Sequence, residues 1–129
     1  VGLGAAAELA RDRTWTIGVR DLRDRFWAAL QDCFGERVQL NGHPTERLCN
    51  TLSVDFVGRV GSEILAALPG VAASTGSACH ADRVTLSAVL EAMHVPPEVG
   101  MGAVRFSLGR STTWDELDAV TEGLATALA

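Results

Sequence analysis

The sequence predicts an α/β domain, with a sheet of about four strands and helices mainly on one face. Segments with apolar residues at three- and four-residue spacing alternate along the chain with short segments in which apolar and polar residues alternate singly. The chain has 129 residues, of which 47% are hydrophobic, and this is enough for one domain with a buried core. The sequence has no internal repeat and no low-complexity linker, so we expect a single domain.

The first third of the chain is predicted to be mainly helical. Residues 1–13 are rich in Ala and favour a helix. A second helix is expected from about Gly18 to Cys33, with an apolar stripe of Val19, Leu22, Phe26, Ala29, Leu30 and Cys33. Gly35 stands where a helix favours a left-handed C-terminal residue. The stripe places the Cys33 thiol in the core.

Four short strands are predicted, at residues 37–41, 50–57, 71–75 and 103–108. The clearest is 50–57, where apolar and polar residues alternate: Leu52, Val54 and Phe56 against Thr51, Ser53 and Asp55. This alternation predicts one core face and one polar face for the sheet.

Three further helices are predicted in the second half of the chain. Helices are expected at 61–68 and 85–94, the second with an inner face of Leu86, Val89, Leu90 and Met93. The last helix begins at Thr113, because Glu116 three residues later completes a capping box. Residues 98–102 are expected to form a flexible loop.

The absence of Lys excludes two kinds of chemistry for this chain on its own. All 11 basic side chains are Arg, and the chain contains no Lys. A chain without Lys cannot form an internal Schiff base with pyridoxal phosphate. It also lacks the phosphate-loop lysine of Walker-type NTPases.

Net charge, hydropathy and cysteine content indicate which partners and which cellular compartment to expect. A net charge of −5 and a pI of about 5.1 argue against nucleic acid as a partner, since neutralising phosphates needs a basic face. No apolar stretch approaches the roughly 20 residues that span a bilayer, and the N-terminus lacks the basic region of a signal peptide. Three Cys do not make a disulfide framework in a chain of this size, so we expect a reducing, cytoplasmic setting without a membrane partner.

Cys79 is the strongest candidate for a chemical role. It follows the small residues 74–78, which allow a ligand or another backbone to come close. The next apolar helix stripe begins only at Leu86, so we expect the thiol on a mobile loop after a strand. A nucleophilic Cys must be accessible and must reach its thiolate form from a free pKa of about 8.5. Cys49, at the head of a strand, is interpreted as structural.

A metal site is not expected. Five residues carry suitable ligand atoms, but none of the usual metal-binding spacings connects them: His43, Cys49, Cys79, His80 and His94. We interpret His94 as a helix-end side chain and His43 as a turn residue.

Arg105 is the candidate for binding an anionic group. In the strand 103–108, Val104, Phe106 and Leu108 share one face, so Arg105 and Ser107 share the other. A planar guanidinium on a strand suits a carboxylate. The alternative is an Arg on a solvated sheet face. Arg110, in a turn, is interpreted as structural.

Four segments together resemble the pyridoxal-phosphate-dependent cysteine desulfurases and the related selenocysteine lyases of the class V aminotransferase group. They are LNGHP at 40–44, RLCNTL at 47–52, STGSACH at 74–80 and VRFSLGRSTT at 104–113. The resemblance covers only the C-terminal small domain of this family of fold-type I enzymes, at residues 19–129. Residues 1–18 are then a remnant of the helix that links it to a missing large cofactor domain. Cys49 and Leu86 depart from the family, which usually has Pro at both positions.

This resemblance implies specific roles. Cys79 would be the catalytic cysteine that attacks the sulfur of the substrate–cofactor adduct, leaving a Cys79 persulfide and releasing L-alanine. Arg105 would bind the substrate α-carboxylate. The complete enzyme would use pyridoxal phosphate, but we expect no cofactor-binding residue in this chain, which alone should be inactive. The implied partners are L-cysteine, a sulfur-acceptor protein, the large domain and a second copy in a homodimer.

Two alternatives stay open at this point. In the first, the complete enzyme is a selenocysteine lyase with L-selenocysteine as its substrate. In the second, the chain is a non-catalytic module whose Cys79 loop docks a partner or accepts sulfur. For a desulfurase, the persulfide would supply iron–sulfur clusters or thio-cofactors.

Overall fold

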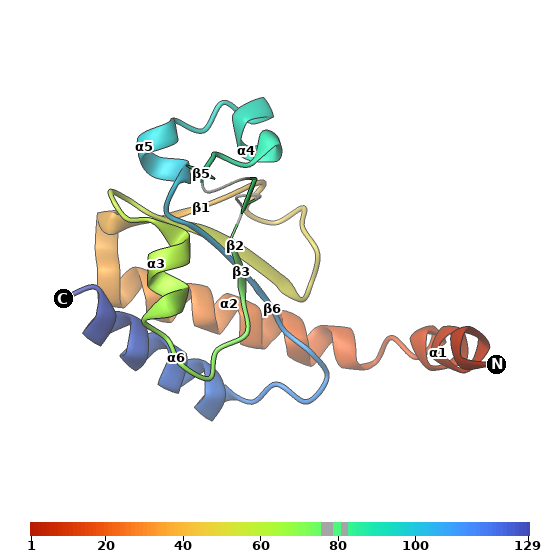
Figure 1. Cartoon of the computed structure of the whole chain (residues 1–129). Coiled ribbons are helices and arrows are strands. Elements are labelled where there is room, and N and C mark those ends of the chain that lie inside the picture. Colours follow the sequence, from red (N-terminus) through yellow and green to blue (C-terminus); the bar gives the residue numbers. More distant parts are fainter. Residues whose placement is uncertain (76–78, 81–82) are drawn as a thin grey trace.

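A four-stranded antiparallel sheet forms the centre of the computed structural model, with strand order β1-β2-β6-β3 (Figure 1). Its strands are β1 (Val38–Leu40), β2 (Thr51–Phe56), β3 (Ser74–Thr75) and β6 (Ala103–Ser107). The structure describes residues 1–75, 79–80 and 83–129, and at 79, 80, 83 and 84 it describes the main chain alone. The predicted α/β fold with a sheet of about four strands is confirmed.

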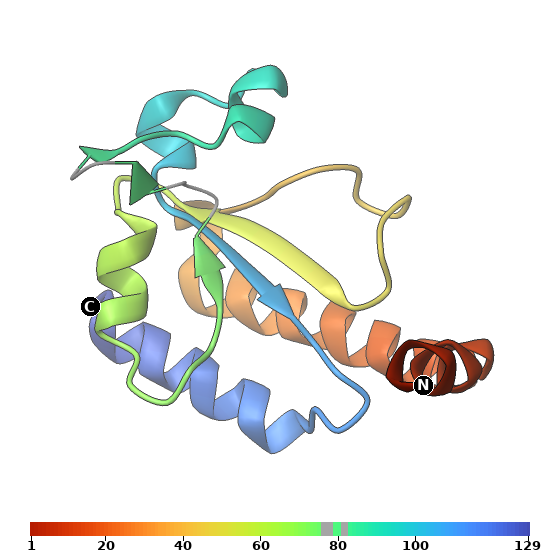
Figure 2. The same ribbon diagram turned by 45° about the vertical axis from the view of Figure 1, so that its right-hand side comes forward.

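Helices lie on both sides of this sheet. The two long helices α2 (Trp15–Phe34) and α6 (Trp114–Ala127) cover one face, while the short helices α4 (Ala88–Ala92) and α5 (Pro97–Gly100) lie on the other side (Figures 1 and 2). Helix α3 (Gly61–Ala66) contacts the edge strand β3. The core therefore fills the space between the sheet and the two long helices.

The buried face of α2 differs from the predicted stripe. It consists of Val19, Arg23, Phe26, Leu30 and Phe34, at the three- and four-residue spacing of one helix face. Its aromatic rings pack edge-on against the sheet, with centroid distances of 5.2 Å for Phe26–Phe106 and 5.4 Å for Phe34–Phe56. Because Phe34 takes the last buried position, Cys33 turns away and is exposed. The prediction that Cys33 belongs to the core is wrong.

The segment before β6 also differs from its prediction. Helix α4 is short, and of its predicted inner face only Leu90 is buried, whereas Val89 and Met93 are exposed. Residues 98–102 were expected to form a loop, but α5 occupies most of this stretch. Pro97 starts α5, because its fixed φ and missing N–H suit the first position of a helix.

The first and last helices of the chain differ in how they are attached to the rest of the molecule. The Glu116 carboxylate accepts the Thr113 N–H at 2.8 Å and the Glu116 N–H donates to the Thr113 hydroxyl at 3.4 Å, so the predicted capping box is confirmed. Helix α1 (Gly2–Arg11) has no buried residue and extends away from the sheet (Figure 1). Arg110 donates to the Leu9 carbonyl at 2.7 Å, which confirms a structural contact for this residue. Within the described ranges, no helix combines the length and apolarity needed to cross a membrane.

Candidate functional site

A row of polar residues crosses the sheet on the face opposite α2 and α6. Ser53 of β2 pairs directly with Arg105 of β6, which in turn pairs with Ser74 of β3. Asn41 extends the row beyond β1, because its N–H donates to the Ser53 carbonyl at 2.9 Å. Directly opposed residues of antiparallel strands point to the same face. We call these four residues, Asn41, Ser53, Arg105 and Ser74, the polar row.

Arg105 lies on the exposed face of β6, as the sequence predicts. Its neighbours Val104 and Phe106 are buried in the core, while Arg105 and Ser107 are exposed. The guanidinium has no hydrogen bond or ion pair with any residue that the structure describes. Its planar set of donors is therefore free to bind an anion, and a carboxylate fits it with two parallel hydrogen bonds.

A pocket of about 300 Å³ opens in front of the polar row. On the sheet side its described lining is Asn41, Gly42, Ser53, Thr75 and Arg105, and on the other side it is Ser87, Val89, Leu90 and Met93. One wall therefore offers hydrogen-bonding groups and one positive charge, and the wall around α4 is mainly apolar. This division suits a small molecule with an anionic end and an apolar end.

Asp55 is a buried acid on the same face of β2 as Ser53. It is 1% exposed and pairs with Ala103, so it lies two residue pairs along the ladder from Ser53 and Arg105, at the next position on the same face. Burial raises the pKa of the Asp55 carboxyl, and the nearby Asn41 amide opposes part of that rise. Neither Oδ1 of Asp55 nor Nδ2 of Asn41 makes a hydrogen bond of ordinary geometry with a described residue. The sequence analysis placed Ser53 and Asp55 on the polar face but missed their place beside Arg105.

The loop at 41–48 holds Asn41 at the edge of the pocket. His43 Nδ1 accepts the Glu46 N–H at 2.9 Å and the Thr45 N–H at 3.2 Å, which confirms His43 as a turn residue. Arg47 Nη2 donates to the Asn41 carbonyl at 2.7 Å. These bonds close the loop on itself, so the position of Asn41 does not depend on a ligand.

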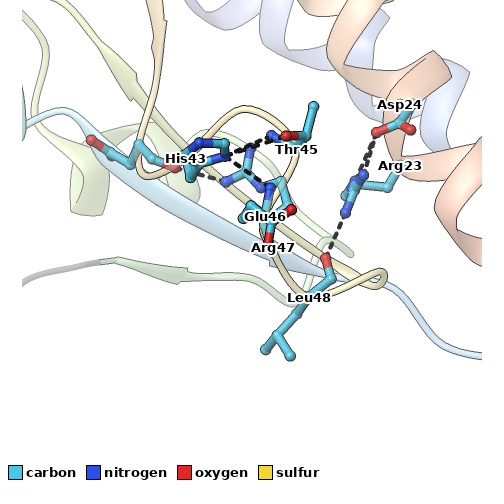
Figure 3. Close-up of polar contacts among 8 residues, drawn as sticks. Arg23, Asp24, His43, Thr45, Glu46, Arg47 and Leu48 are labelled. Atoms are coloured by element: carbon cyan, nitrogen blue, oxygen red, sulfur yellow. Dashed lines mark hydrogen bonds and ion pairs between the residues drawn. The ribbon is translucent and has the colours of Figure 1, made fainter.

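Arg23 connects this loop to the core helix α2. It is 4% exposed and donates from Nη1 to the Leu48 carbonyl at 2.6 Å and from Nε to the Asp24 carboxylate at 2.9 Å (Figure 3). Burial lowers the pKa of Arg47, and the positive charge of Arg23 lowers it further. Sequence reasoning missed Arg23, although an Arg within an apolar helix stripe is itself a signal of a buried contact.

The main chain at Cys79 forms a short strand where the sequence predicted a loop. Cys79 and His80 form strand β4 (Cys79–His80), which pairs antiparallel with β5 (Arg83–Val84), so that Cys79 lies opposite Val84. The side chain of Cys79 and all of residues 76–78 and 81–82 lie outside the described residues. The catalytic role of Cys79 and the carboxylate-binding role of Arg105 therefore stay predictions.

Cys33, Cys49 and His94 lie outside the described lining of the pocket. Cys33 is exposed on α2 and Cys49 is half-buried before β2, and neither lines the pocket. His94 is exposed just after α4, with a positive φ of 59°. The described residues contain no group of three or more His, Cys, Asp or Glu that could hold a metal ion.

A larger groove of about 760 Å³ lies elsewhere, between the segment after α3 and helix α6. Its lining consists mainly of small and apolar residues such as Ala119 and Gly123. Glu116 is the one charged residue in the described lining, and its carboxylate serves the capping box of α6. We therefore place the candidate site at the smaller pocket, where the Arg105 guanidinium is not paired with any described side chain.

Comparisons with known proteins agree with this assignment of fold. No family model matches the chain. A solved NifS-like protein aligns with a TM-score of 0.74 and 28% identity, over 96% of this chain and 30% of its own. The NifS-like protein from Rickettsia africae aligns with a TM-score of 0.72 and 21% identity, over 88% of this chain and 29% of its own, and supports the fold alone. The chain thus has the fold of one part of the NifS-like proteins.

The curated relatives identify that part more closely. The chain is 39% identical over 122 residues to the cysteine desulfurase IscS of Acinetobacter baumannii (strain AYE), covering 93% of this chain and 30% of the relative. It is 42% identical over 130 residues to the cysteine desulfurase IscS of Methanosarcina thermophila, covering 95% and 31% respectively. The chain is therefore homologous to the C-terminal region of the cysteine desulfurases IscS and spans about 30% of their length.

Proposed function

We propose that this chain is the small domain of a cytoplasmic cysteine desulfurase, and that it supplies the sulfur-accepting thiol of Cys79 and the carboxylate-binding guanidinium of Arg105. The observation that carries the proposal is Arg105 in the polar row, which has no partner among the described residues and faces a pocket of about 300 Å³. An enzyme that acts on amino acids needs a fixed group that binds the α-carboxylate, and a guanidinium on a strand provides one.

The proposed reaction takes place between two thiols, that of Cys79 and that of L-cysteine. The thiolate of Cys79 attacks the sulfur of L-cysteine, so that an S–S bond forms while the substrate Cβ–S bond breaks. The electron pair left on Cβ takes up a proton, and the products are L-alanine and a Cys79 persulfide. A sulfur-acceptor protein then removes the terminal sulfur from Cys79.

The cofactor of this reaction must be held by another part of the enzyme. Pyridoxal phosphate supplies the electron sink that makes the Cβ–S bond cleavable. It is held through a lysine, and the chain has none. In our proposal residues 19–129 are the small domain, residues 1–18 lead to it from a cofactor domain, and the complete enzyme is a homodimer. The contribution of this chain is limited to binding the carboxylate and accepting sulfur.

The carboxylate role can be tested on the chain itself. The reaction product L-alanine is titrated into the ¹⁵N-labelled protein, with L-alaninamide, which lacks the carboxylate, as the matched ligand. We expect L-alanine alone to shift the amide signals of Ser53 and Arg105, and Arg105→Ala to abolish these shifts. Arg110→Ala serves as the control, since Arg110 contacts α1 and lies outside the pocket. Equal shifts with both ligands would show that Arg105 does not bind the carboxylate.

A further inference from the structure

Two apolar side chains of α4 are exposed at the pocket instead of being buried. Val89 is 67% exposed and Met93 is 44% exposed, although both were expected on the inner face of this helix. They are four residues apart, so they lie next to each other on one side of the helix. Both line the pocket whose opposite wall carries Arg105.

The position of α4 is fixed by its one buried residue, Leu90. Leu90 is 5% exposed, and it packs with Leu86 and Val95 around Gly100 of α5. A Cβ at Gly100 would lie 2.5 Å from the side chain of Leu86, which precedes α4, and 3.6 Å from that of Leu90 in α4, so α5 packs closely against this segment. The Ser87 side chain caps α4 by accepting the Val89 N–H at 3.2 Å. Val89 and Met93 are therefore held toward the pocket by packing elsewhere.

We propose that Val89 and Met93 form the side-chain subsite of this pocket, and that they select an amino acid with a short apolar or sulfur-containing side chain over one with a hydroxyl. This inference rests on the proposed function, because it assumes that Arg105 binds the α-carboxylate. With the carboxylate at the polar row, the side chain of the amino acid faces the apolar wall.

The chemistry of the two possible side chains explains the selection. A hydroxyl loses hydrogen bonds to water when it meets the side chains of Val89 and Met93, which offer none in return. A thiol is a weak hydrogen-bonding group and loses little by the same transfer. The unbranched, polarisable side chain of Met93 can adapt to a thiol or to a methyl group of the same size. A closed hydrophobic pocket rejects a hydroxyl isostere about 100-fold, and for this open pocket we expect about tenfold.

The experiment compares three amino acids of similar shape that carry the same carboxylate. L-Cysteine, L-2-aminobutyrate and L-serine are titrated into ¹⁵N-labelled protein, and Kd is obtained for each from the amide shifts of the polar row. For the wild-type chain we expect L-serine to bind about tenfold more weakly than the other two. Val89→Thr and Met93→Gln keep the side-chain shape but add polar groups, and each should reduce this ratio to about threefold or less.

The control variant is Leu48→Gln. Leu48 is 70% exposed, which is close to the 67% of Val89, but it lies outside the described lining of the pocket. Its substitution should therefore leave the ratio unchanged. Equal Kd values for L-cysteine and L-serine in the wild-type chain would overturn the subsite while leaving the carboxylate role intact. An unchanged ratio in both polar variants would also overturn it. If none of the three amino acids shifts the polar row, the subsite and the carboxylate role both fail.

Discussion

Ser53 and Arg105 are directly opposed across the β2–β6 ladder, and both face the pocket on the side of the sheet away from the core. The ladder fixes the Cα positions of this pair, and the buried neighbours Val54 and Val104 anchor the two strands from the core side. Arg105 is therefore mounted on one of the most constrained parts of the molecule. Such a position favours binding, because little backbone freedom is lost when a ligand binds.

Asp55 should make the stability of the protein depend on pH. Burial raises its pKa above the usual 3.8, so the folded state holds this proton more tightly than the unfolded state. Stability should therefore fall as the pH rises from about 3.8 through the raised pKa, and the full cost should be present above it. Asp55→Asn should be more stable than the wild type at neutral pH.

Urea unfolding across a pH series measures this effect. The gain of Asp55→Asn over the wild type should shrink as the pH falls, because both folded proteins then carry a neutral group at this position. Asp115→Asn, on the exposed first turn of α6, is the control that should lack this pattern. A gain that is constant across the series would show that ionisation of Asp55 is not its cause.

Two Gly→Ala substitutions should change stability in opposite directions. A Cβ at Gly102 would lie 2.0 Å from the Phe56 carbonyl oxygen, so Gly102→Ala must push the start of β6 away from β2. We expect a loss of about 1–3 kcal/mol. Gly18 lies inside α2 with nothing within 4 Å of its added Cβ, so Gly18→Ala should stabilise by about 0.5–1 kcal/mol.

Thermal unfolding of the two variants checks this pair. The midpoint should fall for Gly102→Ala and rise for Gly18→Ala relative to the wild type. A Gly102→Ala variant as stable as the wild type would mean that the close approach of Gly102 to Phe56 is absent in solution.

The exposure of Cys33 leads to a prediction about thiol reactivity. Cys33 is exposed on α2, whereas Cys49 is half-buried before β2. Brief alkylation of the folded protein with a charged reagent should therefore label Cys33 more readily than Cys49. Mass mapping of the peptides measures both, with labelling in urea as the reference for full access. Stronger labelling of Cys49 would mean that the end of α2 is turned so that Cys33 faces the core.

The sequence predicted the strands of this fold better than its helix faces. The alternation through Ser53 and Asp55 correctly placed a polar face on β2, and Arg105 was correctly placed on the exposed face of β6. The error at Cys33 arose because Phe34, one position further, completes the same stripe equally well. A short apolar helix such as α4 has no periodic signal strong enough to show which residues it buries.

The polar row itself could not be predicted from the sequence. Its members Asn41, Ser53, Arg105 and Ser74 come from four separate segments, and strand order and register bring them together. Nothing in the local pattern fixes that order. The burial of Arg23 likewise depends on a contact with Leu48, which is 25 residues away in the sequence.

The most direct test of the account is to follow sulfur transfer in the complete enzyme. After addition of L-cysteine, mass spectrometry of the peptides locates the persulfide, and L-alanine is quantified in parallel. The account predicts one added sulfur on Cys79, no L-alanine from L-cysteine with Cys79→Ser, and a need for about 10–150-fold more L-cysteine with Arg105→Ala, since a charge-assisted pair contributes roughly 1.5–3 kcal/mol. A persulfide on Cys33 or Cys49 in its place, or undiminished L-alanine formation by Cys79→Ser, would contradict it.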